Sequence, residues 1–328
     1  MRVVYMASVR KAACYTAYSY TGSPNSRFMP DSYATVIATF SRRMRLKRAN
    51  GDEVEARIKG KRLRPVCGDR VLAEPIDNEH DWIITGIAPR DNELTRPDTR
   101  GRTEVLAANI NCLVVVGAPR PTPDWFIIDR YLCAAELIGA AAVVAYNKSD
   151  LSADESTAMT ELENYQSIGY DVVRCSAADG TGIDEIATLL QGRCAIIVGQ
   201  SGVGKSSIIN RLIGDGQLRV ASISDKTSEG RHTTVNSVMI PLPHGGSVID
   251  SPGVRDYAPV LQSSADAAAG FREIAAAAQQ CRFANCRHLR EPGCHVKSCV
   301  ESGSIAERRY ASYKRIVNLT EQLSEGRY

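Results

Sequence analysis

Two short segments of this chain hold the residue types that nucleotide binding requires, and one of them is a phosphate-binding loop. It reads Gly199-Gln200-Ser201-Gly202-Val203-Gly204-Lys205-Ser206-Ser207. Its glycines let backbone N–H groups surround phosphate oxygens, and Lys205 can reach the β and γ oxygens and stabilise their charge during hydrolysis. Ser206 is the expected magnesium ligand. An apolar strand is expected before the loop and a helix after it, at 205–213, and this context favours phosphate binding over a Gly-rich turn without a ligand.

The second segment, Asn147-Lys148-Ser149-Asp150, has the residues that select a guanine base. It follows an apolar segment, 142–146, and so lies where ligands of open α/β sheets bind, at the carboxyl edge. An Asp carboxylate accepts paired hydrogen bonds from N1–H and the 2-amino group of guanine, which adenine does not offer. The sequence therefore predicts GTP rather than ATP, although alone the motif could be a polar turn. The pair Ser176-Ala177 is informative only through its position in the motif order.

The order of these motifs indicates a circularly permuted GTPase domain. In an ordinary GTPase the phosphate loop comes first and the Asn-Lys-x-Asp and Ser-Ala segments come last. Here these two segments precede the phosphate loop, which is followed by Thr233-Thr234 and by Asp250-Ser251-Pro252-Gly253. Because domain termini usually lie close together, a permuted chain can keep every strand in place and still form one nucleotide pocket.

The segments after the phosphate loop supply candidates for catalysis. Asp250 is expected to reach magnesium directly or through water, and the Gly253 N–H is expected to sense the γ-phosphate. Val254 stands where many GTPases place a water-orienting Gln, and valine cannot hydrogen-bond water. His232, beside the switch residue Thr234, is therefore the candidate for positioning the attacking water, with Thr234 as a second magnesium ligand. The alternative for His232 is a surface histidine in a mobile loop.

A Cys/His cluster near the end of the chain has the spacing of a metal site. Its members follow the pattern Cys-x4-Cys-x-His-x5-Cys and are Cys281, Cys286, His288 and Cys294. Three thiolates and an imidazole suit tetrahedral zinc, and four protein ligands leave no open position, so one structural zinc per chain is expected. Cys299 is a spare that could replace one of the four. The alternative is a set of free cysteines in a helical domain.

Composition limits the remaining possibilities. The 328 residues are 44% hydrophobic, which allows two or three domains with their own cores. The sequence has no run of about 18 to 20 apolar residues, so a membrane role is not expected. Four of the ten cysteines fall in 281–299, and without a secretory signal they predict metal binding in a reducing cytoplasm rather than disulfides. Residues 1–33 are expected to be a flexible basic tail; an organelle transit peptide is the alternative.

The periodicity of the chain predicts a multidomain protein. Short β-rich segments at 34–40, 44–48, 54–58, 70–74 and 82–87, with turn signals between them, favour a small barrel of the oligonucleotide-binding (OB) type. From 109 to 250 strands and helices alternate, which indicates an α/β domain with a parallel sheet covered on both faces. The remainder is helical around the Cys/His cluster. The expected domains are an OB-fold at 34–92, a permuted GTPase at 93–258 and a zinc-binding helical domain at 259–328.

The barrel segment carries a concentration of positive charge. Between positions 42 and 64 there are ten basic and three acidic residues, whereas the net charge of the whole chain is only +3. Such a patch predicts contact with the phosphate backbone of RNA. A solvated strand face is the alternative.

Taken together, the sequence resembles the RsgA (YjeQ) family of circularly permuted GTPases over roughly residues 34 to 318. Beside the GTPase motifs and the Cys281–Cys294 segment, the most specific matches are Val66-Cys67-Gly68-Asp69-Arg70-Val71, Ala107-Ala108-Asn109-Ile110, Asp129-Arg130-Tyr131-Leu132, Gly230-Arg231-His232-Thr233-Thr234 and Asp250-Ser251-Pro252-Gly253-Val254-Arg255. Cys67 and Asn111 lie where the family varies or usually differs. The resemblance implies action on the small ribosomal subunit during late maturation, slow intrinsic hydrolysis that the subunit stimulates, and a catalytic role for His232.

We therefore predict a cytoplasmic, monomeric GTP hydrolase that releases GDP and phosphate and assists or checks assembly of the 30S subunit. Its partners would be 16S rRNA and neighbouring ribosomal proteins, with no membrane or DNA partner. The segment 250–253 leads into the zinc unit, so ordering around the γ-phosphate could reposition that unit on RNA. Two alternatives stay open: a nucleotide-gated RNA-binding protein whose hydrolysis is incidental, and a GTPase stimulated by another structured RNA.

Overall fold

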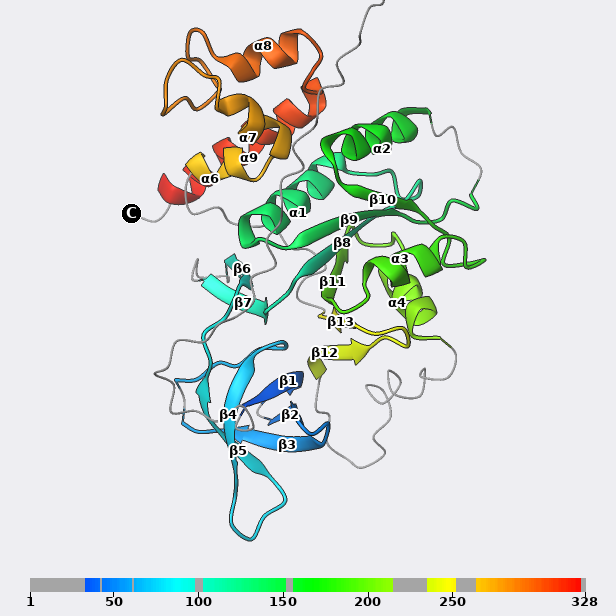
Figure 1. Ribbon diagram of the computed structural model, residues 1–328, viewed down its shortest axis with the longest axis vertical. Helices are drawn as coiled ribbons and strands as arrows, with labels where there is room; N and C mark the ends of the chain where they lie inside the picture. Colours follow the sequence, from blue (N-terminus) through cyan, green and yellow to red (C-terminus); the bar gives the residue numbers. More distant parts are fainter. Residues whose placement is uncertain are drawn as a thin grey trace, which may run out of the picture.

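The computed structural model describes residues 33–41, 43–60, 62–97, 103–151, 156–214, 235–251 and 264–325. A small β-barrel, an α/β unit and a group of helices follow one another along the long axis of the molecule (Figure 1). The predicted multidomain fold is confirmed in these three parts.

Five strands close into the N-terminal barrel. They are β1 (Tyr33–Phe40), β2 (Arg43–Arg48), β3 (Glu53–Ile58), β4 (Arg70–Pro75) and β5 (Trp82–Ile87). β1 pairs with both β2 and β4, and β3 runs parallel to β5, so the order β1-β2-β3-β5-β4 returns to β1. Alternate residues point inward, and Val36, Leu46, Val71 and Ile84 are fully buried in the centre. Closure leaves these apolar side chains without contact with water.

A two-stranded ribbon, β6 (Glu93–Pro97) and β7 (Thr103–Ala108), connects the barrel to the α/β unit. The sequence did not predict this ribbon as a separate element. Gly68 has a φ of +93° and packs against β7 of this ribbon. A Cβ at position 68 would lie 2.0 Å from the Ala108 carbonyl oxygen. The Asn109 side chain donates to the Gly68 carbonyl at 2.8 Å. The buried Asp69 accepts from Arg90 at 2.8 and 2.9 Å. Two of the segments that resemble the RsgA family therefore interlock at this joint.

The α/β unit is built on strands in the order β10-β9-β8-β11-β13-β12. Their bounds are β8 (Cys112–Gly117), β9 (Ala141–Tyr146), β10 (Asp171–Arg174), β11 (Cys194–Gly199), β12 (Val235–Pro241) and β13 (Ser247–Asp250). The first five strands of this order run parallel and β12 is antiparallel to β13. β8 reads as a continuous apolar run and is buried at every position, as a central parallel strand requires.

Helices cover both faces of this sheet, as the alternating pattern predicted (Figure 1). α1 (Trp125–Ile138) and α2 (Ser156–Ile168) pack on one face, and α3 (Ile183–Leu189) and α4 (Lys205–Ile213) on the other. Asp124 caps α1 by accepting from the backbone N–H groups of Phe126 and Ile127. The carboxyl ends of the parallel strands therefore face the loops that carry the predicted motifs.

The barrel and the α/β unit share one sheet. β12 pairs antiparallel with β1, placing Ala38 opposite Val238 and Thr39 opposite Ser237. This pairing was not predicted from the sequence. It joins barrel and α/β strands into one eleven-stranded sheet, so the last strand before β13 belongs to both parts.

The C-terminal helices pack against α1. They are α6 (Ser264–Ala269), α7 (Arg272–Ala278), α8 (His295–Glu301) and α9 (Glu307–Glu325). Phe271, Tyr313 and Val317 form their core and meet Phe126 and Cys133 of α1. In the described part of the chain, no helix is both long enough and apolar enough to cross a membrane.

Candidate nucleotide and metal sites

The phosphate loop begins where β11 ends and closes at the start of α4, the arrangement expected for this motif. Gly199 has a φ of +138°, and a Cβ there would lie 2.2 Å from the Val116 carbonyl oxygen. Gly204 has a φ of +94°, and its Cβ would lie 2.3 Å from the Asn147 amide nitrogen. A side chain at position 199 would collide with the backbone of β8 and one at 204 with the Asn147 amide, and both residues lie at a positive φ, so glycine is favoured at both.

Lys205 is held over the loop that it terminates. Its Nζ donates to the carbonyl oxygens of Gly199 and Gln200, at 2.7 Å each. Ser206 and Ser207 are exposed in the first turn of α4, with Val203 buried behind them. The geometry therefore places a cation and two hydroxyls at the mouth of a backbone loop of the kind that holds phosphates.

One buried amide joins the base-recognising segment to the phosphate loop. The Asn147 Nδ2 donates to the Val203 carbonyl at 2.8 Å, and its Oδ1 accepts from the Ala177 N–H at 3.0 Å. Asn147 is only 2% exposed. Three motifs that lie far apart in the sequence, at 147–150, 176–177 and 199–207, therefore meet at one side chain.

The rest of the base-recognising segment is held in the same way. Asp150 accepts from the Ser176 hydroxyl at 2.7 Å. Lys148, at a φ of +62°, donates to the carbonyls of Arg120 and Gly202 at 2.8 and 2.7 Å. Hydrogen bonding by Ser176 fixes the orientation of the carboxylate that the sequence assigns to guanine.

Two participants in this site were missed by sequence reasoning. Arg211 of α4 donates to the carbonyls of Ala177 and Ala178 at 2.9 and 2.6 Å and so supports the Ser-Ala loop. Arg120, in the segment after β8, accepts from Lys148 through its carbonyl. Neither belongs to a recognisable motif, because backbone carbonyls and helix-surface arginines have no distinctive spacing.

Asp250 lies at the end of β13, as predicted, opposite Val238 of β12. The following residue, Ser251, accepts at 2.9 Å from the buried hydroxyl of Ser237, which ties the start of the Asp-x-x-Gly segment to β12. The predicted catalytic and sensing residues Thr234, His232 and Gly253 lie outside the described residues, as does Val254.

The predicted Cys3His cluster is confirmed as a geometric unit. The ligand atoms of Cys281, Cys286, His288 and Cys294 all lie within 4.8 Å of one another. The His288 Nδ1 is 3.5 Å from the sulfurs of Cys281 and Cys294, which are 3.9 Å apart. A zinc tetrahedron with bonds of about 2.3 Å to sulfur and about 2.0 Å to nitrogen gives S–N and S–S separations of about 3.5 and 3.8 Å. The donor set therefore fits zinc closely.

The backbone around this cluster is supported from α9 and by a carboxylate. The Tyr310 hydroxyl donates to the His288 carbonyl at 2.5 Å. Glu291 accepts from the N–H groups of Arg287, Leu289 and Arg290. Burial raises the pKa of Glu291, but these backbone donors outweigh it and hold the pKa at about 2. The turn that carries the histidine is therefore fixed by a carboxylate that stays ionised.

Two further properties agree with metal binding by these four residues. Burial lowers the pKa of His288 and favours the neutral imidazole that binds metal ions. Cys299, the predicted spare, lies on α8 with its sulfur 3.4 Å from the His295 Nε2 and is not a member of the group.

A buried ionic network fixes the C-terminal helices to the α/β unit, and no functional role was predicted for its members. Arg309 is fully buried and donates to Asp129 at 2.8 Å and to Glu273 at 2.7 and 3.1 Å. Arg308 donates to the other oxygen of Asp129 at 2.6 Å. The Tyr165 hydroxyl donates to Asp129 at 2.6 Å. Asp129 of α1 therefore contacts α2 and α9 directly, and Arg309 of α9 extends the network to Glu273 of α7.

Known proteins match this chain over most of its length. The RsgA GTPase family model matches residues 87–259. The small ribosomal subunit biogenesis GTPase RsgA of Azotobacter vinelandii is 39% identical, with 88% of this chain and 85% of that protein covered. The protein of the same name from Marinobacter nauticus is 38% identical, covering 90% and 87%.

Two solved structures share the fold. YjeQ from Thermotoga maritima superimposes with a TM-score of 0.71 at 29% identity, over 88% of this chain and 98% of that one. YloQ, described as a circularly permuted GTPase, gives a TM-score of 0.70 at 25% identity, over 92% and 98%. These matches confirm the predicted permutation of the α/β unit.

Proposed function

This chain belongs to the RsgA GTPase family, and we propose that it hydrolyses GTP to GDP and phosphate while it assists or checks late maturation of the small ribosomal subunit. The relatives carry the small-subunit role in their names. The observation that best supports a GTP site in this chain is the Asn147 amide, because it brings the base-recognising and phosphate-binding motifs to one place.

In the proposed site, Asp150 accepts hydrogen bonds from the guanine base, and Ser176 keeps its carboxylate oriented. The loop N–H groups and Lys205 bind the phosphates. Magnesium, when bound, neutralises charge between the β- and γ-phosphates, and Ser206 and Thr234 are the residues that would hold it. Asp250 at the end of β13 lies on the same edge of the sheet.

For hydrolysis we assign two roles to the residues of this chain. Lys205 stabilises the charge that develops on the γ-phosphoryl oxygens, and His232 positions the attacking water. His232 takes the role that a glutamine after Gly253 fills in many GTPases, because Val254 stands there instead.

We also propose the domain division 34–92, 93–258 and 259–328, preceded by a tail at 1–33. The closed barrel, the α/β sheet and the packed C-terminal helices support it. We assign one zinc per chain to Cys281, Cys286, His288 and Cys294. Four protein ligands leave no position for a substrate, so zinc supplies a cross-link for a small unit rather than chemistry.

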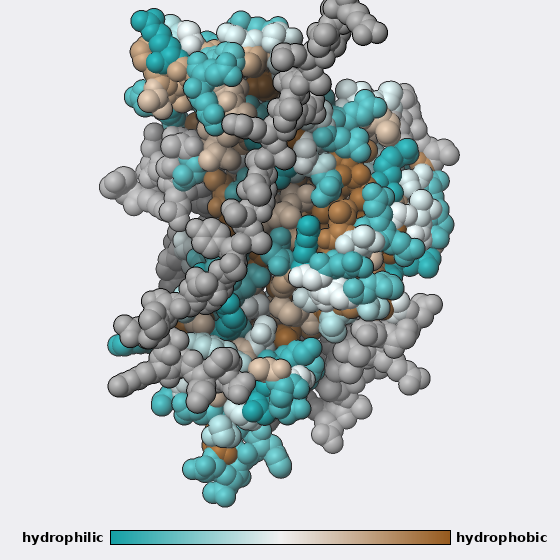
Figure 2. Space-filling model, in the orientation of Figure 1, coloured by the Kyte–Doolittle hydropathy of each residue, from teal (hydrophilic) through white to brown (hydrophobic). Residues whose placement is uncertain are grey.

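The barrel is the proposed contact with 16S rRNA. The part of the barrel surface that is visible in Figure 2 is largely hydrophilic. Several of its arginines are already paired: Arg45 with Glu55 at 3.0 Å and Arg57 with Asp81 at 3.1 Å. Within the described residues Lys59 and Arg62, in the segment after β3, are exposed and make no ion pair. Lys47 and Arg64 are likewise exposed without an ion pair in this part of the chain, and the four residues together are the candidates for RNA contact.

The test is GTP turnover titrated with purified 30S, 50S and 70S particles. We expect acceleration by 30S, and a higher half-saturating 30S concentration in Lys59→Glu/Arg62→Glu protein than in the control Arg96→Glu, which alters the ribbon instead. Acceleration by an unrelated structured RNA but not by 30S would move the proposal to another substrate. No acceleration by any RNA or particle would favour incidental hydrolysis in an RNA-binding protein.

The coupling predicted between the 250–253 segment and the zinc unit stays a prediction. It requires that 30S affinity differ between the GDP-bound protein and the protein bound to a nonhydrolysable GTP analogue. Equal affinities in the two states would contradict it.

A further inference from the structure

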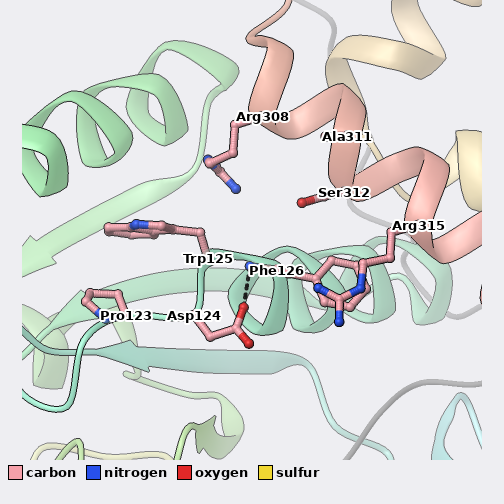
Figure 3. A pocket seen from close by; sticks show the side chains of 8 residues that line it. All are labelled: Pro123, Asp124, Trp125, Phe126, Arg308, Ala311, Ser312 and Arg315. Carbon is pink, nitrogen blue, oxygen red and sulfur yellow. Dashed lines mark hydrogen bonds between the residues drawn. The ribbon is translucent and has the colours of Figure 1, made fainter.

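A pocket of about 480 Å³ opens between the start of α1 and the first half of α9, outside the nucleotide site. Its volume is within the range of about 300 to 1,000 Å³ typical of small-molecule sites. Aromatic rings and guanidinium groups face it together (Figure 3). Its lining includes Asp124, Trp125, Phe126, Arg308, Ser312 and Arg315.

The charged groups of this pocket differ in how far they are neutralised. Arg308 forms ion pairs with Asp129, at 2.6 Å, and with Glu161, so its positive charge is neutralised. The carboxylate of Asp124 caps α1 and faces its positive N-terminal end. Arg315 is exposed and lies over the Phe126 ring at 3.9 Å, and no carboxylate of the described residues forms an ion pair with it. The pocket therefore offers one uncompensated cation.

Its other surfaces suit a flat polar ring. Trp125 is half-buried and turns its indole toward the pocket, opposite the Arg308 guanidinium, whose carbon lies 5.8 Å from the Trp125 ring (Figure 3). The largely buried Ser312 faces the same space from α9. An aromatic plane, a guanidinium plane, a hydroxyl and a free cation together match a nucleobase joined to a phosphate.

From this arrangement we propose that the α1–α9 pocket binds one unstacked nucleotide of an RNA strand, with its base against Trp125 and its phosphate at Arg315. The inference rests on the proposed function, since it takes RNA as the partner. It adds a contact point on the opposite side of the α/β unit from the barrel, so that RNA would be held at two separated places.

The pocket also lies next to the phosphate loop. The Asp124 N–H donates to the Gln200 Oε1 at 3.4 Å, and the Arg120 carbonyl accepts from Lys148. The segment 120–124 therefore contacts both the nucleotide site and the pocket, and a nucleotide in the pocket is sensed at an element that supports GTP binding.

The test uses the fact that the chain has only two tryptophans. Trp82→Phe protein keeps Trp125 as its only tryptophan, and saturating GDP blocks the nucleotide site. Its fluorescence is titrated with a single-stranded RNA decamer, an abasic decamer and free UMP. We expect quenching by the RNA, little by the abasic strand, and much weaker binding of UMP.

The matched variants are Arg315→Ala and Lys314→Ala, both at exposed positions of α9. We expect Arg315→Ala to weaken RNA binding about tenfold, as the loss of one charged contact does, and Lys314→Ala to leave it unchanged. Absence of quenching, equal quenching by the abasic strand, equal effects of the two variants, or UMP binding as tight as RNA would each overturn the proposal. These results are independent of 30S-stimulated turnover, which tests the proposed function separately.

Discussion

Replacing Asn147 by alanine should separate the base-recognising segment from the phosphate loop. The change removes the hydrogen bonds to the Val203 carbonyl and from the Ala177 N–H. At about 1 kcal/mol net for each bond, the loss is about 2 kcal/mol, which corresponds to about a 30-fold weaker affinity for GDP. Because Asn147 is buried, the Val203 carbonyl and the Ala177 N–H have no substitute partner in the variant, and the full loss of about 30-fold is expected when the two segments separate in the nucleotide-free protein.

The assay is calorimetric titration with GDP in the presence of magnesium. Asn210→Ala serves as the control, because Asn210 is an exposed side chain on α4 beside the same loop. Both variants are first compared with the parent by thermal unfolding, so that loss of fold is separated from loss of binding. An Asn147→Ala protein that is folded and binds GDP with parental affinity would refute the reasoning that one amide holds the site together.

Four other predictions concern hydrolysis, the zinc site and the buried ionic network. His232→Ala should leave GTP affinity nearly intact and slow single-turnover hydrolysis with 30S; an unchanged rate would rule out the water-positioning role. Protein purified without chelator should contain about one zinc per chain, and Cys294→Ser should lose it while Cys299→Ser should not; equal zinc content in both variants would remove the assignment. Because burial lowers the pKa of His288 below its ordinary 6.5, the neutral form is favoured in the folded state, so the metal-free protein should lose stability as the pH falls below about 6.5, measured by urea unfolding at several pH values. Arg309→Ala leaves Glu273 without its cation and Asp129 with Arg308 as its remaining cationic partner, and it should cost about 3 to 5 kcal/mol in the unfolding of the C-terminal helices; a cost no larger than that of Lys314→Ala would show that the network is not what holds them.

Local motifs made most of the nucleotide site and the metal cluster predictable. Within each of these motifs the residues are close together in the sequence. The spacing inside the phosphate loop, inside the segment 147–150 and inside the Cys3His group therefore constrains the geometry by itself. The strand-helix alternation from 109 to 250 likewise predicted a covered parallel sheet, because continuous apolar runs such as β8 have few other structural solutions.

Contacts between distant segments were not predictable in this way. The pairing of β1 with β12 depends on which sheet edge meets the barrel, and neither strand carries a signal for its partner. Asp129 reads as one polar residue in an apolar helix, and Arg309 as one of many basic residues. Only the fold brings them together, at a site where an unpaired charge would be costly. A count of charged residues likewise does not show that Arg45 and Arg57 form ion pairs with carboxylates.

Base selectivity before and after Asp150→Asn, measured by calorimetry with GDP, ADP and xanthosine diphosphate, decides whether the permuted motifs bind one guanine nucleotide. A carboxylate at position 150 accepts from the N1–H and 2-amino groups of guanine, whereas an amide can donate to the 2-carbonyl of xanthine. We expect the parent to prefer GDP to ADP by more than about a hundredfold and Asp150→Asn to shift the preference to xanthosine diphosphate. Lys205→Ala should weaken both nucleotides in either background. Equal affinity of the parent for GDP and ADP, or an unaltered preference in Asp150→Asn, would contradict the claim that the permuted motifs form one pocket.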